Sequence, residues 1–230
     1  EGALEGGRCP PLRLRRIHPP AYFRQDEGAP ERPPWKPLSL RWGDGLARRM
    51  IRAFIAIPIP ETTRSQLAVT QFLLPIARPL PVENLHLTLL FLGEQTEDRL
   101  EELHIALEQI TAPPLELQIE GLGVFGGDKP RTVHATFRND PALHRLQARI
   151  ARAADLAGIR REARRFTPHV TLGRFAPGEG SAPALARAIG QIGALQIAPF
   201  TAGHFAMMRS ILRPDGAVYD ELARYPLTHG

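Results

Sequence analysis

The sequence has a single cysteine, Cys9, so it cannot form a disulfide within the chain, and no Cys/His spacing is typical of a zinc site. It contains no run of 18 apolar residues and no apolar signal-peptide segment near its start. Of its 29 basic residues only Lys36 and Lys129 are lysines, a bias typical of genome composition rather than of a function. These absences predict a cytoplasmic protein that does not contact a membrane.

The net charge of +5 is unevenly distributed along the chain. Residues 50–130 carry a net charge of −6, and residues 131–230 carry +7. The second half also contains an arginine-rich run at residues 160–165. Such a basic region raises the local concentration of a polyanion such as RNA, although a solvated arginine loop explains the run equally well.

Residues 1–49 differ from the rest of the chain. They hold eight of the 23 prolines and show neither helical nor strand periodicity. We expect a disordered extension, or residues that are not native, with Met50 as the true start; a genuine basic arm is the competing interpretation. Residues 50–230 would then form the folded domain.

From Met50 onward the pattern alternates between strands and helices. The predicted strands cover about residues 51–59, 85–92, 115–122, 131–137, 169–175, 197–212 and 217–227. The predicted helices cover about residues 61–76, 96–110, 140–158 and 184–192. Leu67, Phe72 and Leu74 are candidate core residues, whereas Gly121, Gly123, Gly126 and Gly127 indicate a loop.

The two halves of the chain have a similar order of elements, which predicts an α+β fold with two lobes related by a pseudo-twofold axis. Each lobe would be a small, mainly antiparallel sheet with helices on its outer face, and a cleft would lie between the lobes.

A short motif occurs once in each half. Residues 84–93 read Asn-Leu-His-Leu-Thr-Leu-Leu-Phe-Leu-Gly, and residues 167–174 read Thr-Pro-His-Val-Thr-Leu-Gly-Arg. In a strand, residues i and i+2 share a face, so His86 lies beside Thr88, and His169 beside Thr171. Two such strands can present two imidazoles and two hydroxyls to one ligand.

These motifs and their flanks resemble the two-histidine (2H) phosphoesterase superfamily, in particular its RNA 2′,3′-cyclic phosphodiesterase branch, also called 2′-5′ RNA ligase. The similar segments are Met50–Ile57, Glu83–Gly93, Gly123–Phe125 with Pro130-Arg131, Phe166–Arg174, and Met208–Ser210 with Pro214, Gly216 and Tyr219. The resemblance covers about residues 50–228. The chain departs from the family at His134, where an aromatic residue, commonly Trp, is usual.

The resemblance implies hydrolysis of RNA 2′,3′-cyclic phosphate ends, such as those of tRNA halves, to 2′-phosphates. It also implies that His86 is the proton donor and His169 the proton acceptor, with 2′-5′ ligation as the reverse reaction. Two imidazoles can move both protons without a metal or cofactor. Thr88 and Thr171 can donate hydroxyl hydrogen bonds, Arg174 and Arg131 can bind the phosphate, and His134 can face the substrate.

Three other functions are left open by the residues alone. The same site could act on a small nucleotide cyclic phosphate or a 2′-5′ oligonucleotide. The chain could bind RNA or nucleotides without catalysis, although both motif histidines are present. A metal site ranks last, because no third ligand stands at a suitable spacing. We expect a monomer, since a cleft between two lobes completes the site within one chain.

Overall fold

The computed structural model describes residues 50–160, 165–176, 178–214 and 216–228. The expectations for residues 1–49 therefore lie outside the described residues, as do residues 161–164 in the middle of the arginine-rich run. Arg160 and Arg165, at the two ends of that run, are exposed.

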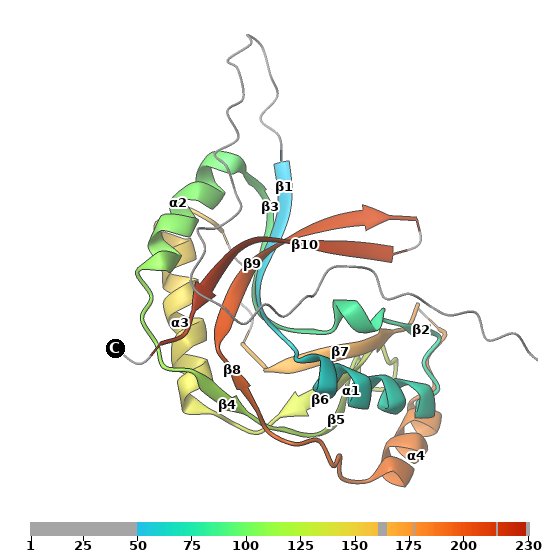
Figure 1. Cartoon of the computed structure of the whole chain (residues 1–230). Helices are drawn as coiled ribbons and strands as arrows, with labels where there is room; N and C mark the ends of the chain where they lie inside the picture. The colour runs from blue at the N-terminus through green and yellow to red at the C-terminus, as the bar shows by residue number, and fades with distance from the viewer. Residues whose placement is uncertain (1–49, 161–164, 177, 215, 229–230) are drawn as a thin grey trace, which may run out of the picture. The chain divides into compact units, whose positions relative to one another are not determined.

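The described strands form an eight-stranded sheet and a separate two-stranded sheet. In the larger sheet the order is β10-β9-β1-β3-β7-β6-β5, with the short strand β2 also paired to β7, and the smaller sheet pairs β4 with β8 (Figure 1). The strands are β1 (Met50–Pro58), β2 (Arg78–Pro79), β3 (His86–Thr96), β4 (Leu115–Leu117), β5 (Ile119–Phe125), β6 (Thr132–Phe137), β7 (His169–Arg174), β8 (Phe200–Ala202), β9 (His204–Arg213) and β10 (Gly216–Pro226). The helices are α1 (Glu61–Leu73), α2 (Glu97–Glu108), α3 (Pro141–Leu156) and α4 (Ala182–Ile192), with a 3-10 turn, η1 (Val82–Asn84), before β3.

The two halves of the duplication meet at their motif strands. The ladders between β1 and β3 and between β6 and β7 are antiparallel, and so is the β3–β7 contact, which pairs Leu87 with Val170. The predicted fold of antiparallel sheet with helices is confirmed. The two half-sheets are joined edge to edge through β3 and β7, rather than being separate sheets.

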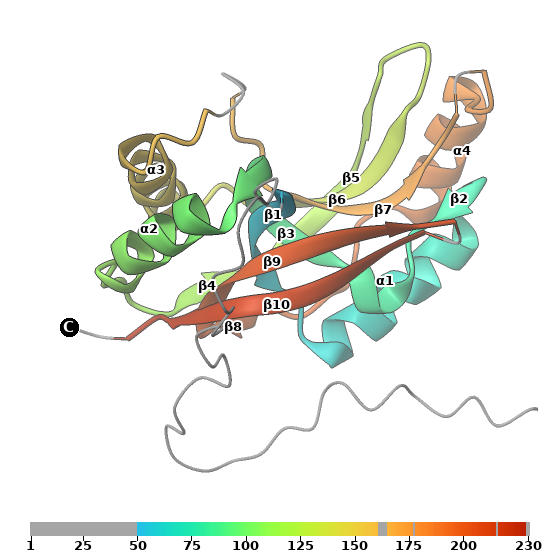
Figure 2. The ribbon, with the colours of Figure 1, turned by 90° about the horizontal axis from the view of Figure 1, so that it is seen from above.

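The hydrophobic core lies on the side of β3 and β7 that faces away from the motif histidines. Leu87 and Val170 are fully buried there and belong to one cluster with Leu67 of α1, Leu103 of α2 and Leu143 of α3. Helices α2 and α3 lie side by side (Figure 2). None of the helices in the described residues is both long enough and apolar enough to span a membrane.

Local sequence signals fix some boundaries and fail at others. Asp140 caps α3 as predicted, because its carboxylate accepts a hydrogen bond from Ala142 N at 2.7 Å. Phe72 is not a core residue: it is 87% exposed. The inward stripe of α1 contains Leu67 and Gln71, and Phe72 falls to its outer side.

The glycines near the two motif strands also differ from expectation. Gly93 does not end its strand, because β3 continues through it to Thr96 with Gly93 at φ +71°. Gly121 and Gly123 lie within β5 rather than in a loop. At Gly123 a side chain would collide with the ring of His134, since a Cβ there would lie 2.6 Å from Nε2. This glycine therefore makes room for an imidazole in the neighbouring strand.

Candidate active site

The pairing of β3 with β7 brings the two motifs together. Because the strands are antiparallel and Leu87 pairs with Val170, His86 lies across from Thr171 and Thr88 across from His169. All four side chains project from the face opposite the buried Leu87 and Val170. The local twofold axis passes between the central residues of the two motifs, so the pairs His86–Thr88 and His169–Thr171 are related by it.

Both motif histidines are held by the same backbone contact. Nδ1 of His86 lies 2.7 Å from the carbonyl oxygen of Asn84, and Nδ1 of His169 lies 2.7 Å from that of Thr167. A carbonyl oxygen only accepts, so Nδ1 of each ring must carry the proton and donate it. In the neutral rings Nε2 is therefore the nitrogen that can accept a proton, and each ring is oriented by the residue two positions before it.

A β-bulge follows each motif at the same position. The register of β3 against β1 shifts after Thr88, at Leu89, and the register of β7 against β6 shifts after Thr171, at Leu172. A bulge adds one residue to a strand and reverses the alternation of side chains beyond it. Arg174 therefore returns to the face that carries His169, since it pairs with Thr132, on the same side as His134.

The bulge in β3 gives Phe91 the position that is symmetry-related to that of Arg174. Phe91 pairs with Phe54 of β1 and is 63% exposed. The rings of Phe54 and Phe91 are 6.2 Å apart. The equivalent position is thus occupied by the cation Arg174 in one half and by the exposed aromatic ring of Phe91 in the other.

His86 lies among aromatic side chains. Its ring centroid is 4.8 Å from that of Phe54 and 5.2 Å from that of Tyr219, which stands edge-on to it. The pKa of His86 is lowered from 6.5 to about 4: burial is the main cause, the positive charges of His169 and Arg174 add to it, and the hydrogen bond to the Asn84 carbonyl partly opposes it. Arg174, one of these charges, lies on the same face by its pairing with Thr132.

His169 has a different set of neighbours. Its ring is 5.0 Å from Phe125 and 5.1 Å from His134, edge-on to both. His134 stacks on Phe125 at 4.0 Å, is only 3% exposed, and has a buried Nδ1 without a hydrogen-bond partner. Burial, followed by the charge of His169, lowers the pKa of His134 to about 4. The third histidine is therefore a neutral ring packed against His169.

The sequence-predicted site residues do not all share this face. His86, Thr88, His169, Thr171, His134 and Arg174 lie together on it. Arg131 comes immediately before β6 and is not part of that strand. Its main chain pairs with Phe125 and Phe175, and its side chain is exposed. Across the described residues, no three His, Cys, Asp or Glu side chains are grouped as metal ligands.

The sequence analysis assigned no site role to three residues that contact the site or its strands: Tyr219, which it named only as part of the similar closing hairpin, Phe91 and Gln71. Tyr219 reaches His86 through long-range pairing of the last hairpin, which no local pattern records. Phe91 would have been assigned to the apolar side of a regular strand, because the bulge at Leu89 has no signal of its own. Gln71 is a polar residue in the inward stripe of α1, and that position was the available signal.

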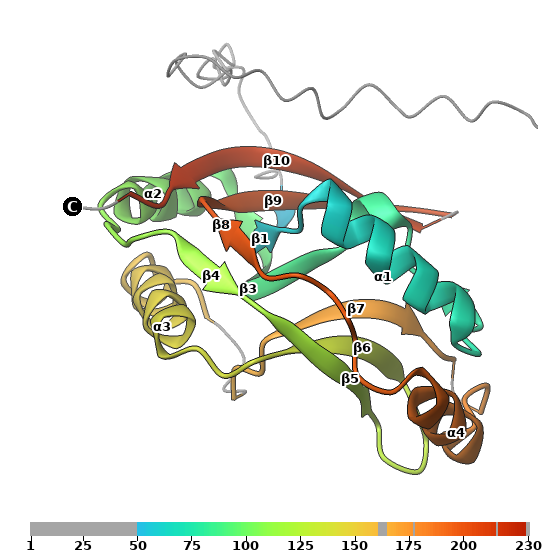
Figure 3. The ribbon, with the colours of Figure 1, turned by 60° about the horizontal axis from the view of Figure 1, so that its bottom comes forward.

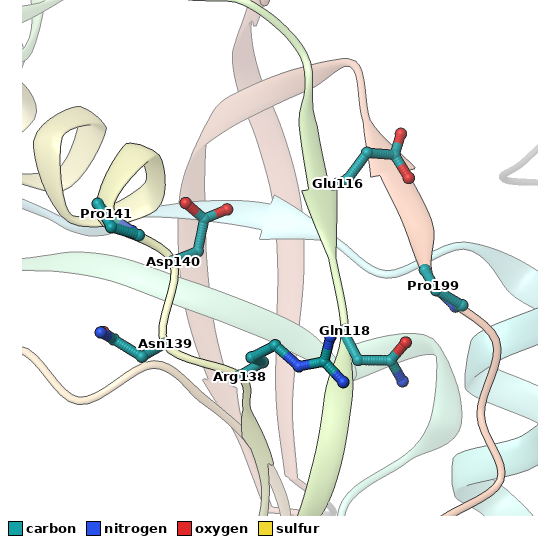
Figure 4. Close-up of a pocket in the computed structure, with 7 residues that line it drawn as sticks. All are labelled: Glu116, Gln118, Arg138, Asn139, Asp140, Pro141 and Pro199. Carbon is teal, nitrogen blue, oxygen red and sulfur yellow. The ribbon is translucent and has the colours of Figure 1, made fainter.

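A pocket of about 360 Å³ lies away from the histidines, between β4, β8 and the start of α3 (Figure 4). Three of the polar side chains that line it are engaged in the fold. Asp140 caps α3, Glu116 accepts the hydroxyl of Thr201, and Gln118 donates to the carbonyl of Ile197 at 2.8 Å. None of the predicted site residues lines this pocket, so we do not assign it a role in the chemistry.

The family model and the similar proteins of known name agree on one family. The family model described as 2′-5′ RNA ligase superfamily matches residues 68–212. The chain is 32% identical over 192 residues to the RNA 2′,3′-cyclic phosphodiesterase of Thermus thermophilus, covering 77% of this chain and 90% of the relative. It is 28% identical over 176 residues to the protein of that name from Archaeoglobus fulgidus, covering 75% and 98%.

Solved structures show the same likeness. The crystal structure of Escherichia coli LigT with 3′-AMP superposes with a TM-score of 0.66 at 25% identity, covering 78% of this chain and 99% of LigT. The structure of TT0787 of Thermus thermophilus superposes with a TM-score of 0.64 at 29% identity, covering 77% and 98%. The likeness therefore extends over nearly the full length of both neighbours.

Proposed function

The chain belongs to the 2′-5′ RNA ligase superfamily, and from this premise we propose that it hydrolyses RNA 2′,3′-cyclic phosphate ends to 2′-phosphomonoesters without a metal ion. The observation that carries the proposal is the pairing of Leu87 with Val170, which sets two histidines and two threonines on one face. The name of the relatives from Thermus thermophilus and Archaeoglobus fulgidus supports the same reaction.

The reaction needs two proton transfers on opposite sides of phosphorus. Nε2 of His169 takes a proton from water while the water oxygen attacks phosphorus. The bond from phosphorus to the ribose 3′-oxygen then breaks, and that oxygen receives a proton from Nε2 of His86. The phosphate stays on the 2′-oxygen. The matching Nδ1 contacts support a role for both rings in proton transfer, because they place the proton of each neutral ring on Nδ1 and its acceptor lone pair on Nε2.

Charge on the phosphoryl oxygens is met by hydrogen-bond donors. Thr88 and Thr171 can each donate a hydroxyl, and Arg174 can add a guanidinium from the end of β7. We assign His134 to the substrate side of the same face, next to His169. Arg131 would have a peripheral role, in contacts with the RNA backbone, because it is exposed and lies before β6 rather than on it.

His86 must gain a proton before it can act as the acid. With a pKa of about 4 it is neutral in the free protein near pH 7. A bound phosphate anion between the imidazoles favours the charged form and raises that pKa. The substrate would thus supply the charge that converts His86 from a neutral ring into a proton donor.

The exposed ring of Phe91 and the basic second half of the chain both favour a nucleic acid end as substrate. A nucleobase can stack on an exposed aromatic side chain, a contact worth about 1–3 kcal/mol. The solved structure of LigT with 3′-AMP favours a second candidate, a small nucleotide cyclic phosphate acted on by the same residues. Run in reverse with an RNA 5′-hydroxyl in place of water, the same site would form a 2′-5′ linkage without ATP.

The test uses a short RNA that ends in a 2′,3′-cyclic phosphate, incubated with the full chain in EDTA. We expect turnover to a 2′-phosphate, located by phosphorus NMR, and the same rate with and without the chelator. A 3′-phosphate product, or activity abolished by EDTA, would contradict the proposal. Faster turnover of a mononucleoside 2′,3′-cyclic phosphate than of the RNA would favour the small-nucleotide alternative.

A further inference from the structure

A buried glutamine contacts the bulge that turns Arg174 onto the catalytic face. Gln71 of α1 is only 7% exposed, and its amide nitrogen donates to the carbonyl oxygen of Leu172 at 2.7 Å and to that of Leu80 at 2.9 Å. Leu172 is the bulge residue of β7. Helix α1 lies beside β7 in the views of Figures 1 and 3, consistent with this bond.

The segment that follows α1, residues 74–80, contacts the same bulge. Leu80 N donates to the Leu172 carbonyl at 2.9 Å, so that oxygen accepts two hydrogen bonds. Ile76 packs against Gly173, where an added Cβ would lie 2.1 Å from its Cγ2. Arg78 of β2 then pairs with Arg174 itself. Leu172, Gly173 and Arg174 are therefore all contacted by residues 71–80.

The chemistry of the buried amide indicates a purpose beyond packing. Burying a polar side chain costs free energy unless it is hydrogen-bonded, and an apolar residue would fill the same space at lower cost. Gln71 directs both bonds of its amide nitrogen at backbone carbonyls that border the bulge. The other half has a weaker counterpart, since Gln147 of α3 donates to the carbonyl of Leu89, the bulge residue of β3, at 3.4 Å.

We propose that Gln71 is a positioning residue that holds the Leu172 bulge in the register that directs Arg174 toward His86 and the substrate phosphate. The inference rests on the proposed function for the phosphate contact, but the position of Arg174 can be measured without turnover. We call the hydrogen bonds from Gln71 to Leu172 and Leu80 the clamp. Without it, β7 can relax toward a regular strand, in which regular alternation would direct Arg174 to the opposite face.

The first experiment is a double-mutant cycle. Gln71→Met removes the amide but keeps a side chain of similar length. We expect it to lower kcat/KM by about tenfold in the native background and by less than about twofold in the Arg174→Ala background. Gln66→Leu is the matched control, because Gln66 is an exposed glutamine of the same helix, and it should leave kcat/KM unchanged. Equal losses in both backgrounds would overturn the proposal.

The second readout does not depend on activity. Burial is the main cause of the low pKa of His86, and the charges of His169 and Arg174 add to it. NMR titration of the free protein should therefore show a higher His86 pKa in Arg174→Ala, an intermediate one in Gln71→Met, and the native one in Gln66→Leu. If the native protein shows no turnover but the His86 pKa shifts in this way, the proposed function is rejected and the positioning role of Gln71 is supported. An unchanged His86 pKa in Gln71→Met would reject the clamp.

A second variant guards against a Gln71→Met protein that does not fold. Ile76→Ala removes the side chain that packs on Gly173 while leaving α1 intact, because Ile76 lies after the helix and is only partly buried. We expect the same direction in both readouts, with a smaller effect. Gln147→Leu, which acts on the other bulge, should be additive with Arg174→Ala; strong coupling between them would also argue against a local clamp.

Discussion

The two halves of the molecule share the same backbone arrangement around the motif histidine, but the side chains around that histidine differ. In each half a histidine is held through Nδ1 by the carbonyl two residues before it, and a bulge follows the threonine. His86 packs on Phe54 and Tyr219, whereas His169 packs on Phe125 and a third imidazole, His134. The duplication thus supplies two imidazoles held in the same way, and the side chains around them differ.

The largest expected effect comes from removing either histidine. His86→Ala and His169→Ala should each lower kcat on an RNA cyclic phosphate by about 10²–10⁴-fold, because each removes one of the two proton transfers. Initial rates with purified variants check this, and circular dichroism controls for folding. A variant that keeps the native rate would show that the two halves are not both required.

The symmetry-related pair Arg174 and Phe91 should separate phosphate binding from nucleoside binding. Arg174→Ala should lower kcat/KM by about 10- to 100-fold for every cyclic phosphate, since it removes a charged donor from the phosphate. Phe91→Ala should raise KM about tenfold for nucleotides but leave the Kd for inorganic phosphate unchanged. Kinetics and calorimetry measure both effects.

Phe72→Ala is the matched control for Phe91→Ala. Phe72 is also an exposed phenylalanine, on α1. It should change neither constant. Equal effects of the two substitutions on nucleotide KM would show that Phe91 does not contact the base.

Phosphate binding should shift the titration of His86. Its pKa is about 4 in the free protein because of burial and the charges of His169 and Arg174. Saturating inorganic phosphate adds an anion and should raise that pKa by about one unit or more. Histidine NMR in the presence and absence of phosphate measures this. A pKa that falls or stays constant would place the anion away from His86.

The smallest effect concerns stability in acid. Because the folded-state pKa of His134 is lowered from 6.5 to about 4, the unfolded chain binds more protons within that range. The free energy of unfolding should therefore decrease as pH falls from 6.5 toward 4. His134→Phe should reduce the loss between pH 7 and pH 5 by about 1–2 kcal/mol. Urea denaturation at the two pH values tests this, and an identical loss in both proteins would contradict it.

The sequence predicted those parts of the site that depend on local alternation and on repetition. His86 with Thr88, and His169 with Thr171, share a face because strand side chains alternate, and this held in the fold. Asp140 marked the start of α3 because a cap is a local interaction. The similar order of elements in the two halves predicted the duplication.

Features that depend on tertiary contacts could not be read from the pattern. A regular strand would have directed Arg174 away from His169, and the bulge that reverses this is hydrogen-bonded to Gln71 of another element. Gly123 looked like a loop residue, but its lack of a side chain makes room for His134. Phe72 looked like a core residue, but the inward position of the helix belongs to Gln71.

The most direct test of the account is whether His86 and His169, which are held in the same way, have different roles as acid and base. A cyclic phosphate with sulfur in place of the 3′-oxygen has a leaving group that departs without protonation, so it needs the base and not the acid. We predict that this substitution restores most of the activity lost in His86→Ala and none of that lost in His169→Ala. Rescue of His169→Ala instead, or of neither variant, would contradict the assigned division of roles.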